Sequence, residues 1–177
     1  MTSPNKVKAK AQKLEEENYE FRAFLKNHAD EDELDAYFLS LHKELFANYD
    51  CCKCANCCKE YPISFDATDI ARISAFLGIG EKDFIAKYLK NADSADEKPH
   101  KTKVKPCPFL CDDGSCEVQG CKPVTCREYP YTDQPKRIWS LYNVIFNAEV
   151  CPVVFEVLER LKVIYKFRKA STLKRVK

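Results

Sequence analysis

The chain has little of what marks nucleotide-binding, secreted or membrane-spanning proteins. It contains only four glycines in 177 residues, and none forms a P-loop or a dinucleotide-binding fingerprint. The N-terminus lacks the apolar stretch of a secretory signal, and no window approaches the roughly 18 apolar residues that a membrane span needs. These absences predict a cytoplasmic protein without a membrane partner.

The charge excess that is typical of nucleic-acid-binding proteins is also missing. The chain has 29 lysine and arginine residues against 27 aspartate and glutamate residues, which leaves a formal net charge of +2. Such a balance does not favour nucleic acid as a partner. We interpret the basic end of the chain, residues 166–177, as a frayed and solvated terminus rather than an RNA-binding segment.

Cysteine is the abundant residue, with eleven in the chain. Cys51, Cys54 and Cys57 recur every three residues, Cys58 completes a vicinal pair, and a second cysteine-rich block spans residues 107–126. Stable disulfides are rare in the reducing cytoplasm, and an odd number of thiols would leave one unpaired. Thiolates are the soft ligands that zinc and iron–sulfur clusters select, so the sequence predicts a protein built around bound metal.

The spacing of the thiols leaves the kind of metal open. Two residues between thiols allow one segment to place both on the same ion or cluster, with neighbouring amides directed at the sulfurs. Adjacent cysteines such as Cys57 and Cys58 project in different directions, which indicates two metals, or one ligand and one non-ligand. The tight repeat and the remote Cys151-Pro152 step favour an iron–sulfur cluster, whereas the long separation between the two blocks is typical of zinc.

Hydrophobic periodicity predicts a mainly α chain, with a small, irregular, cysteine-rich and metal-stapled domain between flanking helices. We expect the cysteine run itself to be a loop wrapped around metal, residues 91–103 to be a loop, and residues 138–146 to be a short strand. Removal of the metal should unfold much of the domain. The helices are predicted at residues 5–28, 31–48, 66–77, 81–90 and 151–168.

These elements divide into three predicted parts. Residues 1–48 form an N-terminal helical extension, residues 49–168 form the cysteine-cluster metal-binding domain, and residues 169–177 form a basic tail. The helices of the extension are the surface through which we expect an unidentified protein partner, if any, to bind.

Few residues other than cysteine suggest a site. His42 is interpreted as a surface residue of a helix and His100 as a residue of the polar loop. Arg127 follows a predicted ligand and is expected either to bond carbonyl groups or to compensate the negative charge of a thiolate cluster. Tyr129 and Trp139 are predicted to lie in the core or to cover the cluster.

Several short motifs follow one another in a single order between about residues 51 and 155. They are Cys51-x-x-Cys54-x-x-Cys57-Cys58, Pro62-Ile63-Ser64, Asp69-Ile70-Ala71-Arg72-Ile73, Cys107-Pro108-Phe109-Leu110, Asp113-Gly114-Ser115-Cys116, Lys122 to Pro130, and Cys151-Pro152. This order closely resembles the YkgJ-type cysteine-cluster family, whose CxxCxxCC domain is described as zinc- or iron-chelating. The chain departs from the family at Gln119 and Lys122, where an aromatic residue and an arginine are common.

The resemblance implies both a set of ligands and a function. The implied metal ligands are Cys51, Cys54, Cys57, Cys58, Cys107, Cys116, Cys126 and Cys151, and Cys52, Cys111 and Cys121 are extra to the family pattern. The implied function is a metal-binding protein that holds an iron–sulfur cluster, or zinc, in an accessory, redox or sensing role.

Two alternatives stay open. A weaker similarity to the cysteine-rich region of flagellin lysine N-methylases implies a cluster-dependent protein-modifying enzyme, although the chain has no recognisable methyl-donor site. A zinc-stapled interaction module is the other alternative, and the sequence does not decide whether the protein is an enzyme.

Overall fold

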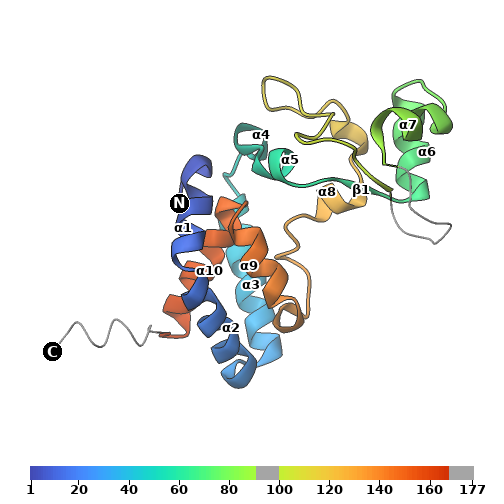
Figure 1. Cartoon of the computed structure of the whole chain (residues 1–177). Helices are drawn as coiled ribbons and strands as arrows, with labels where there is room; N and C mark the ends of the chain where they lie inside the picture. Colours follow the sequence, from blue (N-terminus) through green and yellow to red (C-terminus); the bar gives the residue numbers. More distant parts are fainter. Residues whose placement is uncertain (91–99, 168–177) are drawn as a thin grey trace. The chain divides into compact units, whose positions relative to one another are not determined.

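The computed structural model describes residues 1–90 and 100–167. These residues are mainly α-helical, with one two-stranded sheet in the described part of the chain, which confirms the predicted fold class (Figure 1). None of the helices in this part is long and apolar enough to cross a membrane.

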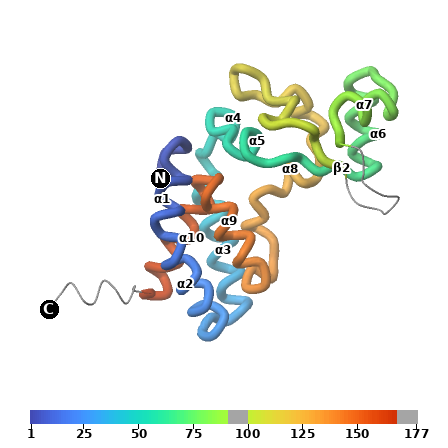
Figure 2. Tube along the Cα trace, in the orientation of Figure 1, coloured from blue at the N-terminus to red at the C-terminus, as the bar shows by residue number. Residues whose placement is uncertain are grey.

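The described residues form two compact units. Met1–Tyr49 and the described residues from Pro130 onward make up the first unit, and Asp50–Tyr129 make up the second. The second unit is therefore formed by one continuous stretch of the chain, which lies in sequence between the two halves of the first unit (Figure 2). The predicted three-part division at residues 48 and 168 stays a prediction, and its basic tail, 169–177, lies outside the described residues.

The first unit is helical. Helix α10 (Pro152–Ile164) packs against α3 (Glu31–Phe46) and α9 (Leu141–Ala148). Their apolar faces form a core that includes Phe38, Leu141, Val153 and Val157. Its elements are α1 (Pro4–Lys13), α2 (Glu15–His28), α3 (Glu31–Phe46), a 3₁₀ turn (Arg137–Trp139), α9 (Leu141–Ala148) and α10 (Pro152–Ile164).

The segment predicted as one helix at 5–28 consists of two helices that meet at Leu14. The break lies where basic residues in the last turn of α1 give way to the acidic run Glu15–Glu17 in the first turn of α2. Both arrangements suit the dipoles of the separate helices. The predicted apolar stripe is nevertheless correct, since Val7, Phe21 and Leu25 are buried.

The prediction of a strand at residues 138–146 is wrong, because α9 occupies most of this segment. Its aromatic and β-branched content favoured a strand. Leu141, Val144, Ile145 and Ala148 are all buried, however, and this spacing matches one face of a helix.

Trp139 was predicted to lie in the core or to cover the cluster, and that prediction is also wrong. Its side chain is 72% exposed, and the ammonium of Lys26 lies 4.0 Å from the centre of its ring. His42 bonds Thr132 Oγ1 within the first unit, at 2.8 Å.

The second unit combines short helices with a small antiparallel sheet, in which Ser64 pairs with Lys101. His100, predicted to lie in a loop, is therefore part of a strand, and residues 91–99 of that predicted loop lie outside the described residues. The elements are α4 (Cys51–Cys54), α5 (Asn56–Glu60), β1 (Ser64–Phe65), α6 (Ala67–Phe76), α7 (Glu81–Tyr88), β2 (His100–Lys101), a 3₁₀ turn (Gln119–Cys121) and α8 (Val124–Glu128).

Helix α6 lies where the sequence predicted it. The Asp66 carboxylate accepts a hydrogen bond from the Asp69 N–H at 2.7 Å, and Gly78, with φ of +68°, follows the helix C-terminus. Ile70 and Ile73 are buried as expected, but Phe76, predicted on the same stripe, is 57% exposed.

An apolar cluster forms the core of the second unit and borders the thiols. The rings of Phe65 and Phe109 lie 5.8 Å and 6.1 Å from that of Phe84, measured between centroids. Cys107, Cys116 and Cys126 are partly buried against this cluster. The core thus packs against three thiols of the second cysteine-rich block. Its buried members are Ile63, Phe65, Ile70, Ile73, Phe84, Leu89, Phe109, Val118 and Cys121.

Candidate metal centre

The cysteine run folds as two short helical turns, α4 and α5, rather than the predicted loop. The Asp50 carboxylate accepts hydrogen bonds from the N–H groups of Cys52 and Lys53, at 3.0 and 3.3 Å, and so begins the first turn. Ala55 then adopts a left-handed conformation, with φ of +49°, and separates the turns. Cys51 and Cys54 consequently lie on one turn, and Cys57 and Cys58 lie on the other.

Two backbone contacts join the run to the loop of residues 107–116. The Cys107 N–H donates to the Cys58 carbonyl at 2.7 Å. Gly114 approaches the Cys52 carbonyl so closely that a Cβ atom at this position would lie 2.3 Å from the oxygen. The fold therefore brings the first cysteine block beside the second.

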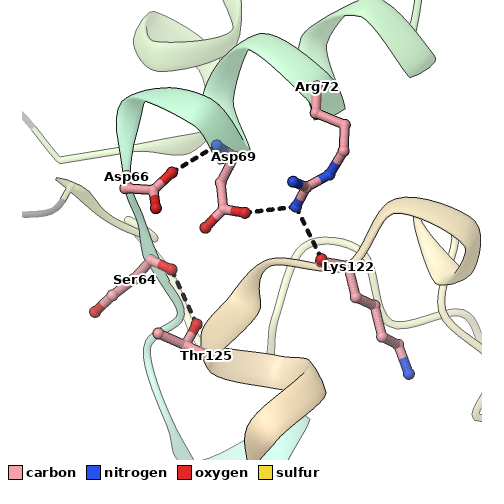
Figure 3. Close-up of polar contacts among 6 residues, drawn as sticks. All are labelled: Ser64, Asp66, Asp69, Arg72, Lys122 and Thr125. Atoms are coloured by element: carbon pink, nitrogen blue, oxygen red, sulfur yellow. Dashed lines mark hydrogen bonds and ion pairs between the residues drawn. The ribbon is translucent and has the colours of Figure 1, made fainter.

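The third segment of the site carries Cys126 and is tied to β1 and α6 (Figure 3). The Thr125 hydroxyl donates to the Ser64 carbonyl at 3.0 Å, and Arg72 Nη2 donates to the Lys122 carbonyl at 3.0 Å. These bonds fix the chain on both sides of the Pro123–Val124 step where α8 begins.

Cys58, Cys107, Cys116 and Cys126 are electrostatic neighbours, and we call them the four-thiol cluster. Burial raises the pKa of Cys107 to about 11 and that of Cys126 to about 12. Burial also raises the pKa of Cys116. The charge of the Cys58 thiolate raises the pKa of each of the other three, so the four sulfurs repel one another when ionised.

Cys58 differs from the other three members of this cluster. A hydrogen bond with Cys57 lowers the pKa of the Cys58 thiol to about 6, and the charges of Lys122 and Lys59 act in the same direction against the effect of burial. Cys58 is therefore the member of the cluster whose thiol ionises most readily.

Backbone amides stabilise the thiolate form of two sulfurs. Hydrogen bonds from Phe109 and Leu110 lower the pKa of Cys107 in opposition to burial, and one from Val118 does the same for Cys116. The sequence led us to expect such amides beside thiols that are two residues apart, as in the 51–57 run, and for that run the expectation stays a prediction. Such bonds favour thiolate ligands and tune the chemistry of the metal that they hold.

Lys122, which the sequence shows only as a departure from the family pattern, influences several of the thiols. Its charge lowers the pKa of Cys51, Cys58, Cys116 and Cys126. Arg127, for which charge compensation was an expected role, is exposed. The available signal in the sequence was a lysine inside the second cysteine block, but only the fold indicates which thiols its charge affects.

The other thiols are placed differently. Cys51 and Cys111 are exposed, whereas Cys121 is buried within the apolar cluster, where burial raises its pKa. Cys52, Cys54 and Cys57 are half-buried on the two helical turns.

Cys151 belongs to the first unit, where it is buried at the residue before α10. Its predicted role as a ligand therefore rests on the sequence alone. The full set of eight ligands stays a prediction. Within residues 1–90 and 100–167, no three Cys, His, Asp or Glu side chains are grouped closely enough to form a ready-made site for a metal ion. This includes the four-thiol cluster, whose members are defined by their mutual effects on pKa and not by ligand distances.

The fold and the thiols together define a mainly helical, cysteine-rich protein. The model of the CxxCxxCC family, described as "Putative zinc- or iron-chelating domain", matches residues 50–152. The chain belongs to this family, and metal binding through its cysteines is thereby supported. No curated protein and no solved structure matches the chain. The similarity to flagellin lysine N-methylases stays a prediction.

The family match spans the whole second unit and ends at the residue after Cys151. It therefore includes the four-thiol cluster, the two helical turns of the cysteine run and α9 of the first unit. Helices α1, α2 and α3 precede it.

Proposed function

We propose that the second unit holds an iron–sulfur cluster through Cys58, Cys107, Cys116 and Cys126, in an accessory, redox or sensing role. The observation that carries this proposal is that α5, the 107–116 loop and α8 bring these four thiols within electrostatic reach of one another. Four thiolates are the usual ligand set of such a cluster. The neighbouring thiols of Cys51, Cys54 and Cys57 would serve a second metal.

The environment of the thiols supports a redox role. Cys107, Cys116 and Cys126 lie against an apolar core, and amides are directed at two of these sulfurs. Hydrogen bonds to sulfur and exclusion of solvent are the features by which a protein sets the potential of an iron–sulfur cluster. Zinc bound to the same thiolates would have no redox chemistry and would act as a structural staple.

The test is anaerobic purification of the full chain without chelator, followed by measurement of metals, acid-labile sulfide and the visible spectrum. We expect brown protein that contains iron and sulfide and whose absorbance bleaches with dithionite. Colourless protein that contains zinc and no sulfide would overturn the iron–sulfur proposal and leave thiolate chelation standing. Protein that binds neither iron nor zinc would overturn both the iron–sulfur proposal and metal chelation by these thiolates.

The pKa values of the thiols predict that metal affinity increases with pH. Cys107, Cys116 and Cys126 have raised pKa values, so at pH 7.5 each must lose a proton to become a ligand, whereas Cys58, with a pKa of about 6, is already ionised. Zinc binding to the apo-protein should therefore release one proton from each of the first three.

Proton release can be measured with a pH indicator in weak buffer while Zn²⁺ is added, and affinity with a competing chelator at pH 6.5, 7.5 and 8.5. The Cys111→Ser variant is the control and should release the same number of protons. An affinity that does not change across this range would contradict the prediction.

A further inference from the structure

We propose that an aromatic strip on the surface of the first unit docks an acidic, amphipathic helix of a partner protein. The strip consists of Trp139 in the 3₁₀ turn and of Tyr142 and Phe146 on α9. These residues belong to the first unit, whereas the four-thiol cluster lies in the second. The inference therefore goes beyond the proposed function and does not depend on whether the thiols bind metal.

Helix α9 carries large apolar side chains on two faces. Leu141 and Val144 are buried in the core, as expected for the inner face of a surface helix. On the outer side Trp139, Tyr142 and Phe146 are 72%, 48% and 54% exposed, and their spacing of three and four residues places them on one side of the helix. Single exposed apolar side chains are ordinary, but a row of aromatic rings is typical of an interaction surface.

Two cations of α2 lie against this strip. The guanidinium carbon of Arg22 is 4.0 Å from the centre of the Tyr142 ring, and the ammonium nitrogen of Lys26 is 4.0 Å from the centre of the Trp139 ring. Arg22 and Lys26 are one turn of α2 apart, so the two rings are neighbours along the surface. Within residues 1–90 and 100–167 neither cation forms an ion pair with a carboxylate. Their charges are therefore available to an acidic partner.

The turn that carries Trp139 is held in place before any partner binds. Asp35 of α3 accepts a hydrogen bond from the Arg137 N–H at 2.8 Å, and the buried Arg137 guanidinium donates to the Tyr131 carbonyl. Tyr131 has φ of +62°, which is costly for a residue other than glycine and persists only where its surroundings enforce it. The Glu31 carboxylate accepts a hydrogen bond from the indole N–H at 3.2 Å and orients the ring. An aromatic ring held in this way loses little conformational entropy when a partner covers it.

The shape and the charge of the strip select the kind of partner. The rise from Trp139 to Phe146 is about 10 Å, which matches about two turns of a partner helix with an apolar row at helical spacing. Such a helix would cover the rings, and carboxylates beside its apolar row would lie near Arg22 and Lys26. The net charge of only +2 does not favour nucleic acid or an anionic membrane as the occupant instead.

Trp139 is the single tryptophan of the chain, so its fluorescence reports directly on the strip. The probe is a synthetic four-turn peptide helix with leucine at helical spacing, glutamate at the flanking positions and no tryptophan. A second peptide has lysine in place of every glutamate. We expect the acidic peptide to shift the emission of the full chain to shorter wavelength in a saturable manner, because it replaces water around the indole. The basic peptide should leave the emission unchanged.

Two phenylalanine variants form a matched pair, since each removes an exposed ring from a helix and retains the tryptophan. Phe146→Ser should weaken binding of the acidic peptide at least about tenfold, as loss of a central aromatic contact does. Phe76→Ser lies in the second unit and should bind like the wild type.

A separate variant tests the charges. Arg22→Gln combined with Lys26→Gln should weaken binding about fivefold at low salt and less at high salt, because exposed ion pairs contribute little and salt screens them. Circular dichroism shows which variants are folded, and only those are compared. If Phe146→Ser does not fold, the charge variant and the two peptides decide the proposal.

The opposing outcomes are distinct. If the acidic peptide causes no shift at about 1 mM, where even weak binding would be seen, the docking proposal is overturned. Equal effects of the two peptides would overturn the acidic partner, and equal binding to Phe146→Ser and Phe76→Ser would overturn the strip as the site.

Other occupants are tested in the same way. A shift caused by single-stranded oligothymidylate or by phosphatidylserine vesicles, but not by the acidic peptide, would assign another class of partner and overturn the proposal. Self-association of the chain that Phe146→Ser abolishes would assign the strip to a second copy and overturn it as well. Metal content enters none of these measurements, so the proposed function is tested separately.

Discussion

Cys126→Ser should lose its metal, and Cys111→Ser should keep it. Cys126 is half-buried against the apolar core, and the charges of Cys107, Cys58 and Cys116 all raise its pKa, so it lies among the other thiols of the cluster. Cys111 is exposed on the turn of the 107–116 loop. Loss of a ligand should reduce metal affinity by more than the roughly 100-fold that loss of an outer partner costs.

The measurement is metal content per chain after anaerobic purification, together with Zn²⁺ affinity of the apo-protein. Cys54→Ser and Cys52→Ser form a matched pair in the first block, and we expect loss of metal only for Cys54→Ser, because Cys52 is extra to the family pattern. Equal loss of metal in all four variants would contradict the division between the thiols of the family pattern and the extra ones.

Gly114→Ala should both destabilise the second unit and weaken metal binding. A Cβ atom at this position would lie 2.3 Å from the backbone oxygen of Cys52, and the backbone has φ of +84°, which side chains rarely allow. The left-handed conformation alone costs roughly 1–2 kcal/mol. The clash adds to this, because it falls on backbone that cannot rotate away. We therefore expect a loss of at least about 2 kcal/mol in the free energy of unfolding.

Gly120→Ala is the control for this change. No atom lies within 4 Å of the place where its Cβ would be added, and we expect an effect within about 0.5 kcal/mol. Urea unfolding of apo and Zn²⁺-loaded protein measures stability, and chelator competition measures affinity. If Gly114→Ala had the same stability and the same Zn²⁺ affinity as the wild type, the close approach of the two cysteine blocks would not support the site.

The elements that the sequence predicted well are those with a single apolar face and clear helix-starting residues. The helix predicted at 31–48 is α3, whose N-terminus is capped by Asp30 and whose buried face includes Leu34, Phe38 and Leu41. The segment of α9 was predicted as a strand because its aromatic and β-branched residues favour strands, although the spacing of its apolar residues matches one face of a helix. Residue type is a weak guide where packing against neighbouring helices decides the structure.

The chemistry of the site could be predicted from the sequence, but which thiols lie near one another could not. Spacing indicated which thiols could bind metal, but the proximity of Cys58 to Cys107 depends on a backbone hydrogen bond between residues far apart in sequence. The hydrogen bond from Arg72 to the Lys122 carbonyl likewise joins residues fifty positions apart, and no local pattern connects them. Cys151 looked equivalent to the other thiols until the structure placed it in the first unit.

The interrupted first unit has a consequence for how the chain folds. Its two halves are separated by the whole of Asp50–Tyr129, so packing α10 against α3 requires closure of a long loop, and the entropy lost rises with the number of unfolded residues between the ends. A second unit that has already condensed shortens that loop. Metal that folds the second unit would then also favour the packing of α10 against α3 in the first. During synthesis the cysteine-rich residues would emerge before α10 exists to complete the core.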